Sequence, residues 1–542
     1  MREIKNLLPV VDIFAGPGGL GEGFTQAGFE ILLSAEMDPV ACQTLTLRKF
    51  FHQFAKLNAP EAYYKFIRGE VGIEVLKENY QKEWSKAVNA VANVELGTKE
   101  GNSAFNKRLD QKLNNRDDFI LIGGPPCQAY SLAGRSRMLG VGSKHAKEEH
   151  VPKNNLQARL ANVFYEDKRH TLYLEYVKIL CRYQPAIFVM ENVKGMGSAK
   201  SGVAESQGST FNNICYGLRN PYDAVAMRTR AGKLPKGYKL YSLSEESTEL
   251  FKQSEIKTAS ECVLRSEKYG VPQARHRIII VGVREDFDFV PNKLMQSSVS
   301  ATVRETIGKL PALRSGLSRE KDTATFWRDA ILDQVRDSLM GYTDIDEQIK
   351  EATINLMVKA KQYKRGAPFI RCGKKDINCQ NETLSALIND SRIKGVLQHE
   401  TRSHIRADLL RYFLVSILGQ INGKSPKFSD WKGKLSSIKP KHTNVSLNNK
   451  GLQSSSHKDR FKVQVWDKPS STVVSHISKD GHYFIHPDPT QCRSLTVREA
   501  ARLQTFPDNY FFCGTRTQQY HQVGNAVPVL LAMQIAELLI SS

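Results

Sequence analysis

Residues 1–290 alternate between short apolar runs and segments of helical periodicity, and this alternation restricts the folds open to the chain. Strands in series with intervening helices favour an open, mostly parallel sheet with helices on both faces. Such sheets bind ligands at the carboxyl ends of their strands. We therefore predict a doubly wound α/β fold whose site lies directly after the apolar runs. These runs lie at 7–14, 29–34, 119–122, 186–190 and 277–283.

A glycine-rich turn follows the first apolar run. Residues 12–21 read Asp-Ile-Phe-Ala-Gly-Pro-Gly-Gly-Leu-Gly, and glycines between a strand and a helix let the backbone approach a ligand closely. Glu36 ends the second run, 17 residues after Gly19, and a carboxylate there can accept hydrogen bonds from both hydroxyls of a ribose. The pattern indicates a nucleoside cofactor of undecided identity, because a tight turn without a ligand has the same sequence.

Residues with nucleophilic and acid–base chemistry follow the third and fourth runs. Two prolines, Pro125 and Pro126, stiffen the turn before Cys127. A thiolate is the best nucleophile among side chains at neutral pH. Most single cysteines are small buried hydrophobes, but one in a rigid loop at a strand end is a candidate nucleophile. Glu191 follows the fourth run and can act as a general acid if its pKa is raised.

Two arginines precede the fifth run in the segment Gln273-Ala-Arg275-His-Arg277. Arginines two residues apart before a strand share one side and can hold a phosphate and a polar carbonyl. Taken singly, each also fits an ordinary surface ion pair. Together with Cys127 and Glu191, they provide a nucleophile, an acid and paired cations beside a nucleoside pocket.

The charge of the chain favours a polyanionic partner. Lysine and arginine number 77 against 56 acids, for a net charge of +21. Nucleic acid is the first expectation and an anionic membrane the second. Residues 361–480 carry 23 basic and 9 acidic side chains, whereas 291–360 carry 10 of each. This basic stretch is either a solvated surface or a region that lies along phosphates.

Cysteine usage and hydropathy indicate the compartment. The nine cysteines are scattered and form no Cys-x-x-Cys pair, so we expect neither a metal site nor a disulfide scaffold. No apolar run reaches the roughly 20 residues of a membrane helix, and the first residues do not resemble a signal peptide. We therefore predict a cytoplasmic protein that does not span a membrane.

The order of these motifs resembles the DNA (cytosine-5) methyltransferases, in their prokaryotic modification type. The resemblance covers residues 10–290 and 464–540 and implies the Rossmann-like fold of class I S-adenosylmethionine-dependent methyltransferases with a separate, smaller target-recognition domain. Its carriers are the loop at 14–19, Pro125-Pro126-Cys127-Gln128, Glu191-Asn192-Val193, Gln273-x-Arg275-x-Arg277, Arg498-Glu499 with Leu503-Gln504-Thr505-Phe506-Pro507, and Gly524-Asn525-x-Val527-Pro528.

The resemblance also implies domain boundaries. The catalytic domain would span 1–290, with a helical insertion at 73–116. The target-recognition domain would span 291–480 and be basic from 361, and residues 481–542 would complete the catalytic domain. Within the recognition domain, Arg402, Arg406 and Arg411 are candidates for contacts with bases.

The resemblance implies a mechanism at a flipped-out cytosine, since the chemistry cannot occur inside a duplex. Cys127 would add to carbon 6, and Glu191 would donate to ring nitrogen 3. Arg277 would hold the cytosine carbonyl, with Arg275 as a second catalytic cation. The supporting residues implied for the pocket are Gln128, Ser131, Asn192 and Gln273.

The same resemblance implies S-adenosylmethionine as the cofactor. Glu36 would bind its ribose, and Met37 would pack on the adenine where an aromatic side chain is common. Gly69-Glu70-Val71 is similar to the adenine-contacting segment, although the family has aspartate in place of Glu70. The full cofactor set implied is Asp12, Phe14, Gly16, Gly18, Gly19, Glu36, Met37, Glu70, Pro126 and Asn525.

Three alternatives remain beside a DNA (cytosine-5-)-methyltransferase. A transfer-RNA cytosine-5 methyltransferase of the same fold would lack a large basic insert. A nicotinamide-dependent oxidoreductase would leave Cys127, Glu191 and the arginines unexplained. A non-catalytic DNA-binding relative should have lost Cys127 or Glu191, and both are present. We expect a monomer that acts on double-stranded DNA beside a separately encoded restriction nuclease or defence protein.

Overall fold

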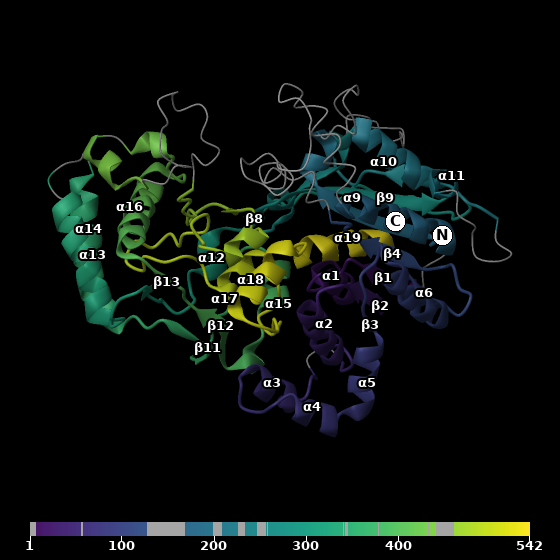
Figure 1. Cartoon of the computed structure of the whole chain (residues 1–542), viewed down its shortest axis with the longest axis horizontal. Coiled ribbons are helices and arrows are strands. Elements are labelled where there is room, and N and C mark those ends of the chain that lie inside the picture. The colour runs from purple at the N-terminus through teal and green to yellow at the C-terminus, as the bar shows by residue number, and fades with distance from the viewer. Residues whose placement is uncertain are drawn as a thin grey trace, which may run out of the picture.

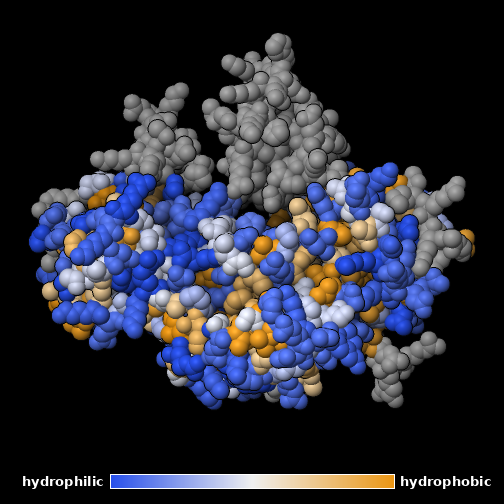
Figure 2. All heavy atoms as spheres, turned by 60° about the horizontal axis from the view of Figure 1, so that its bottom comes forward, coloured by the Kyte–Doolittle hydropathy of each residue, from blue (hydrophilic) through white to orange (hydrophobic). Residues whose placement is uncertain are grey.

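The computed structural model describes residues 7–55, 58–126, 168–198, 209–225, 234–245, 256, 258–339, 341, 345–377, 379–431, 433–440 and 460–541. Two lobes are joined by a central layer that contains the C-terminal helices (Figure 1). Hydrophilic side chains cover most of the lobe at the left of Figure 2. Cys127, Gln128 and Ser131 lie outside the described residues.

The larger lobe is built on one mixed sheet with the order β3-β2-β1-β4-β5-β9-β6, in which β7 also pairs with β9. The first five strands in this order are parallel, and β9 runs antiparallel to its neighbours. The predicted doubly wound α/β fold is therefore confirmed. Strand bounds are β1 (Val10–Ile13), β2 (Ile31–Glu36), β3 (Val91–Asn93), β4 (Ile120–Gly123), β5 (Ile187–Val193), β6 (Tyr238–Tyr241), β7 (Val263–Arg265) and β9 (His276–Arg284).

The order in which strands are added to the sheet reverses between β1 and β4. β2 and β3 lie on one side of β1, whereas β4 and then β5 lie on its other side. In open α/β sheets, ligands bind at such a switch point. The glycine-rich turn follows β1, and the Pro125-Pro126 turn follows β4. The topology therefore brings these two motifs to the same crevice.

Helices cover both faces of this sheet, so alternate residues of one strand enter different cores. Val10 belongs to the core under α1 and α19, whereas Val11 and Ile13 belong to the core under α6 and α9. A Cβ atom on Gly23 would collide with Ala532, which shows how closely α1 and α19 pack. Helix bounds are α1 (Gly19–Gln26), α6 (Lys99–Leu113), α9 (Lys168–Tyr183), α10 (Ser209–Arg219), α11 (Pro221–Val225) and α19 (Val529–Ser541).

Residues 516–541 are long and apolar enough to cross a membrane by composition alone, with a mean hydropathy of 1.8. They comprise α18 (Arg516–Asn525) and α19, and 78% of the apolar window is buried inside the protein. Their hydropathy is that of a core helix, since α19 packs against α1 in the central layer.

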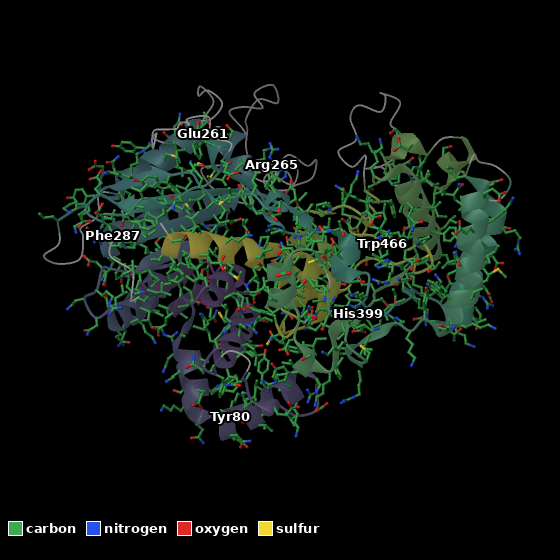
Figure 3. All side chains as sticks on the ribbon, turned by 180° about the vertical axis from the view of Figure 1, so that it is seen from behind. Tyr80, Glu261, Arg265, Phe287, His399 and Trp466 are labelled. Atoms are coloured by element: carbon green, nitrogen blue, oxygen red, sulfur yellow. The ribbon has the colours of Figure 1, made fainter. Side chains whose placement is uncertain are left out.

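The expected insertion at 73–116 is wrong in its second half. Val91 and Ala92 of β3 pair with Ser34 and Ala35 of β2, and α6 contributes to the core of the sheet. Residues 91–113 are therefore a strand and helix of the main fold. The helical projection comprises α3 (Glu61–Ile67), α4 (Glu74–Asn79) and α5 (Gln81–Asn89), and Tyr80 lies at its outer end (Figure 3).

The smaller lobe has its own hydrophobic core, which begins at Leu317 and includes Trp327, Phe413 and Trp431. This core lies among α13 (Ala324–Ser338), α14 (Asp346–Lys359) and α16 (Arg406–Asn422). Residues 294–310 pack instead with the larger lobe, so the second core does not begin at 291. The exact extent of a recognition domain stays a prediction.

Part of the expected recognition domain belongs to the central layer. Leu384 and Val396 lie in the same core as α1 and α19, while Ile393 and Leu397 pack against the helical projection. These residues therefore pack with the larger lobe and its helical projection, and not with the core of the smaller lobe. The elements of the central layer are α12 (Val303–Ile307), β11 (Gly366–Arg371), α15 (Glu382–Ile388), β12 (Gly395–Glu400) and α17 (Val497–Leu503).

Two short parallel strand pairs also connect distant parts of the chain. β8 (Gln273–Ala274) pairs with β14 (Ser470–Ser471), and β10 (Gly316–Leu317) pairs with β13 (Ser403–His404). The first pair attaches the segment before β9 to the chain that returns from the smaller lobe.

Candidate active site

The glycine-rich turn has the backbone that a closely approaching ligand requires. Phe14, Gly16 and Gly18 have φ values of 55°, 57° and 94°, a region that glycine enters readily and other residues rarely. Helix α1 begins directly after Gly18 without a side-chain cap. Its first N–H groups are therefore available to a ligand, as is common where helices bind anionic groups.

Packing from the C-terminal segment fixes the position of this turn. A Cβ atom on Gly19 would collide with the carbonyl of Val527, and one on Gly18 would lie 2.7 Å from Leu45 Cδ2. Asn525 lies two residues before Val527, is exposed, and has its Nδ2 3.2 Å from His521 Nδ1. Asn525 therefore precedes the residues that pack against Gly19, and its place in the cofactor set stays a prediction.

Glu36 lies at the end of β2, and its carboxylate braces the turn. Oε2 accepts the N–H of Gly16 at 2.8 Å, and Oε1 accepts the N–H of Asp38 at 2.9 Å. Burial raises the pKa of Glu36, while the backbone donors of Asp38, Gly16 and Met37 oppose this rise. The adjacent Met37 side chain is 58% exposed, so a planar group could cover it.

Glu70 does not lie at this site. Its carboxylate binds Arg68 Nε at 2.8 Å and Arg371 Nη2 at 2.9 Å, in the turn before α4. The structure gives the expected adenine-contacting segment at 69–71 no support, because those residues belong to the helical projection and end no strand of the sheet.

The strand end beside Glu36 is that of β3, which sequence reasoning missed. Asn93 Nδ2 donates to the carbonyls of Glu36 and Met37 at 3.1 and 2.9 Å. The only signal in the sequence is the short segment Val-Asn-Ala-Val-Ala-Asn-Val at 88–94. A strand of three residues is too short to be distinguished from the helices around it by periodicity.

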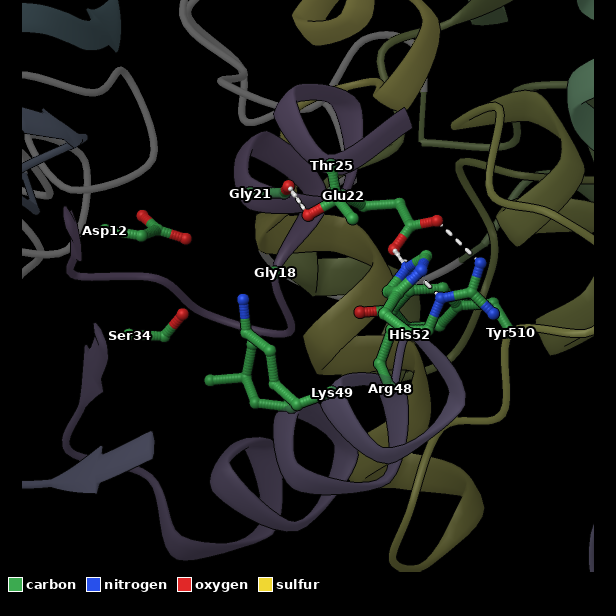
Figure 4. A pocket seen from close by; sticks show the side chains of 11 residues that line it. Asp12, Gly18, Gly21, Glu22, Thr25, Ser34, Arg48, Lys49, His52 and Tyr510 are labelled. Atoms are coloured by element: carbon green, nitrogen blue, oxygen red, sulfur yellow. Dashed lines mark hydrogen bonds and ion pairs between the residues drawn. The ribbon is translucent and has the colours of Figure 1, made fainter. Parts of the chain in front are cut away.

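Asp12 lies beneath the turn instead of facing a ligand. It is 1% exposed, and neither carboxylate oxygen has a hydrogen-bond partner. A Cβ atom on Gly21 would lie 2.8 Å from Asp12 Oδ2. Asp12, Ser34 and Lys49 line an internal cavity between the sheet, α1 and α2 (Pro39–Phe51), as Figure 4 shows. This placement corrects its expected contact with the cofactor.

Glu191 and Arg277 meet at the ends of adjacent strands. Arg277 Nε lies 2.7 Å from Glu191 Oε1, and both side chains are largely shielded from solvent. A Cβ atom on Gly124 would lie 2.6 Å from Glu191 Oε2, so the turn after β4 passes directly over the carboxylate. The sequence predicted both residues, and the structure brings them together.

The turn after β4 is also attached to the residue that follows Glu191. Asn192 Nδ2 donates to the carbonyl of Pro125 at 3.4 Å, and Asn192 Oδ1 accepts the N–H of Val193 at 2.7 Å. Pro126 is half-buried and precedes Cys127 directly. The described part of this turn therefore leads toward Cys127 from a point beside Glu191.

Gln273 and Arg275 make their hydrogen bonds with the C-terminal segment. Gln273 Oε1 accepts the N–H of Val473 at 2.7 Å, and its Nε2 donates to the carbonyl of Leu503 at 3.1 Å. Arg275 Nη1 donates to the carbonyl of Val473 at 2.6 Å. Both side chains are buried. Arg275 is thus placed to hold the C-terminal segment against β9, and its catalytic role stays a prediction.

The three arginines proposed for base contacts already have partners. Arg402 donates to the carbonyl of Lys479 at 2.9 Å and lies 4.0 Å over the ring of Tyr520. Arg406 binds Glu320 at 2.6 Å, and Arg411 binds Asp408 at 2.7 Å. Arg402 in particular is a buried connection between the smaller lobe and α18, so it is wrong as a candidate for base contacts.

Known proteins match this chain along most of its length. The family model of C-5 cytosine-specific DNA methylases matches residues 8–60, 160–220 and 258–541. Type II methyltransferase M.Bpa9945I of Bacillus paralicheniformis is 30% identical, over 97% of this chain and 97% of its own. Type II methyltransferase M.AgeI of Thalassovita gelatinovora is 25% identical, over 98% of each chain.

Proposed function

The chain belongs to the family of C-5 cytosine-specific DNA methylases, and we propose that it methylates a flipped-out cytosine in one short duplex sequence through a covalent adduct with Cys127. The observation that carries this proposal is the Glu191–Arg277 pair beside the turn that leads to Cys127. The family describes DNA as the substrate, so the transfer-RNA alternative is not favoured.

The nucleophilic step rests on Cys127. Its thiolate adds to carbon 6 of the cytosine, and the electron pair of the double bond moves to carbon 5. Glu191, when protonated, donates to ring nitrogen 3 and so favours this addition. Bound S-adenosylmethionine would supply the methyl group to carbon 5. Loss of the carbon 5 proton to solvent then returns an electron pair to the ring, which expels Cys127 while Glu191 takes back the proton from nitrogen 3.

Arg277 positions the cytosine in this scheme. Its guanidinium can hold the cytosine carbonyl, since it presents several donors in a fixed plane. Its Nε lies 2.7 Å from Glu191 Oε1, so the same side chain also holds that carboxylate in position.

The cofactor of this family is S-adenosylmethionine, which supplies the methyl group. The residues of the β1 and β2 ends fit it. The turn at 14–19 has the left-handed backbone of a close approach, Glu36 offers a carboxylate for the ribose, and exposed Met37 can pack on a ring. Asn93, at the end of β3, would replace Glu70 as the nearest residue to the adenine.

We infer the biological role of this activity from the relatives, which are Type II methyltransferases. Such a protein would act in the cytoplasm, as a monomer on double-stranded DNA. A separately encoded restriction nuclease or defence protein would be its partner. The exposed cations of the basic stretch would neutralise phosphates and offset the energy of flipping the base.

The experiment is methyl transfer from labelled S-adenosylmethionine to unmethylated DNA, with transfer RNA as the competing substrate and base-resolution mapping of the product. We expect label on carbon 5 of cytosine within one recurring DNA sequence. Label on transfer RNA alone would reject the proposed substrate. Label scattered over cytosines without a common sequence would reject the proposed specificity.

Replacing Glu36 by glutamine should weaken cofactor binding by about 10- to 100-fold, because a hydrogen bond to a charged group contributes roughly 1.5–3 kcal/mol. Glu36 also accepts the N–H of Gly16, so the change loosens the turn as well. Titration calorimetry with S-adenosylhomocysteine measures the effect. Glu30→Gln is the control, since Glu30 is exposed at the opposite end of β2. Equal affinity in both variants would contradict the prediction.

A further inference from the structure

The C-terminal segment touches the cofactor turn through one buried tyrosine. The hydroxyl of Tyr510 donates to the carbonyl of Pro17, in the middle of the turn. The same hydroxyl would lie 3.1 Å from a Cβ atom on Gly18. Tyr510 is 1% exposed and follows α17, and it lines the same internal cavity as Gly18 of the turn (Figure 4).

The ring of Tyr510 is held firmly in place. Its centroid lies 4.7 Å from that of Phe506 and 5.2 Å from that of Phe512. Its backbone carbonyl accepts Arg498 Nη2 at 2.8 Å. The hydroxyl therefore occupies a fixed position set by residues outside the turn, as a positioning group requires.

The buried ion pair of Arg48 and Glu22 also packs against Tyr510. Arg48 lies 4.9 Å from the centre of the Tyr510 ring. Its Nε and Nη2 donate to the two carboxylate oxygens of Glu22, at 2.9 and 2.6 Å. Its Nη1 donates to Asn509 Oδ1 at 2.8 Å. Glu22 lies on α1, which begins at the turn, so one network holds both α1 and the residues at 509–510.

The network continues to the chain between the two lobes. Asn509 Nδ2 donates to Asp390 Oδ2 at 2.6 Å, and the hydroxyl of Tyr64 donates to the same oxygen at 2.7 Å. Asp390 lies between α15 and β12. The position of Tyr510 is thus tied to the central layer, far from the turn in sequence.

We propose that Tyr510 is a positioning residue for cofactor binding, which holds the Pro17 carbonyl and thereby keeps the turn in its ligand-binding backbone. It touches neither substrate nor cofactor and acts through the turn. The inference rests on the proposed function only in taking this turn as the cofactor site. It adds that the segment after the smaller lobe sets the shape of that site.

The buried location of the Pro17 carbonyl explains why loss of the Tyr510 hydroxyl should weaken cofactor binding. Without the hydroxyl, this carbonyl faces a buried ring and has lost its protein donor, which is costly for a backbone acceptor. The turn can recover a partner only by moving, and its residues at Gly16 and Gly18 already have positive φ values. Movement away from the bound geometry reduces the fraction of binding-competent protein and so lowers the apparent affinity.

The test is Tyr510→Phe, which keeps the ring and removes only the hydroxyl. Tyr520→Phe is a matched control, because Tyr520 is equally buried and its hydroxyl donates to the carbonyl of Leu495 at 2.7 Å, away from the turn. Calorimetry with S-adenosylhomocysteine on the full chain gives Kd, and thermal unfolding confirms that both variants fold.

We expect a Kd about fivefold to tenfold higher for Tyr510→Phe, as follows from a lost neutral hydrogen bond, and an unchanged Kd for Tyr520→Phe. The KM for the cofactor should rise by the same factor, while kcat at saturating cofactor stays within about twofold. Equal Kd values for wild type and Tyr510→Phe would overturn the inference, as would an equal rise in both variants. Failure of wild type to bind the cofactor would instead overturn the proposed cofactor site.

Discussion

Replacement of Cys127 by serine is expected to lower kcat for methyl transfer by at least roughly 10⁴-fold, the scale of losing an essential nucleophile. A serine hydroxyl is almost entirely protonated at neutral pH, whereas a cysteine thiol ionises readily and its thiolate is the better nucleophile. Cofactor binding should survive, because serine is close to cysteine in size and the residues proposed for the cofactor at the ends of β1 and β2 are unchanged. Single-turnover transfer of labelled methyl groups measures the change.

A trapping experiment separates the nucleophile from a merely structural cysteine. A duplex whose target cytosine carries fluorine at carbon 5 cannot lose a proton there, so the adduct with Cys127 should persist through denaturing electrophoresis. Cys372→Ser is the control, since Cys372 follows β11 in the central layer and burial raises the pKa of its thiol. A stable adduct with the Cys127→Ser variant, or turnover equal to wild type, would refute the mechanism.

Acidification from pH 7 to pH 5 is expected to destabilise the fold through buried neutral histidines. Burial, assisted by Arg493 and Arg502, lowers the pKa of His399 to about 4. Burial, with His482 and Arg402, lowers the pKa of His404 to about 3. Both values lie below the ordinary value of 6.5, so the unfolded chain binds more protons than the folded chain in this window. Stability therefore falls as the pH falls below about 6.5.

The hydrogen bonds of His399 explain why it resists a second proton. Its Nε2 lies 2.8 Å from the carbonyl of Pro311 and must donate to it, and its Nδ1 lies 2.9 Å from Thr496 Oγ1. Thr496 Oγ1 accepts the N–H of Glu499 and can donate to Nδ1. A protonated ring would lose this acceptor. His399 lies in the central layer that joins the lobes (Figure 3), so its protonation weakens that layer.

The expected size is about 2 kcal/mol of unfolding free energy lost per histidine at pH 5, from 1.36 kcal/mol per pKa unit. Asp12 opposes the loss, because burial raises its pKa to about 7 and the folded chain then binds the extra proton on acidification. Urea unfolding at pH 7, 6 and 5 gives the slope. His399→Gln should flatten the slope, and exposed His521→Gln should not; equal slopes in all three proteins would contradict the assignment.

The sequence determined the order and the chemistry of the strand ends. β1, β2, β4, β5 and β9 form where apolar runs predict them, because strand length and apolar periodicity are properties of neighbouring residues. The glycine turn, Glu36 and Glu191 lie at the carboxyl ends of these strands simply because they follow the apolar runs in the chain. The usual handedness of the connections between parallel strands leaves few other ways to assemble those motifs.

The direction of single side chains was decided by the tertiary structure. Both faces of β1 are covered by helices, so its sequence does not state which face is nearer to a ligand, and Asp12 turns toward α2. The exchange of Glu70 for Asn93 has a related cause. β3 is only three residues long, and its identity as a strand comes from pairing with β2.

Contacts between segments distant in the chain could not be predicted from the sequence either. Gln273 and Arg275 meet partners about 200 residues away, and Tyr510 meets Pro17 across 493 residues. Periodicity and turn chemistry act over a few residues and can be read locally. Which buried donor faces which carbonyl depends on how whole layers pack, since every buried polar group must find its partner in the assembled fold.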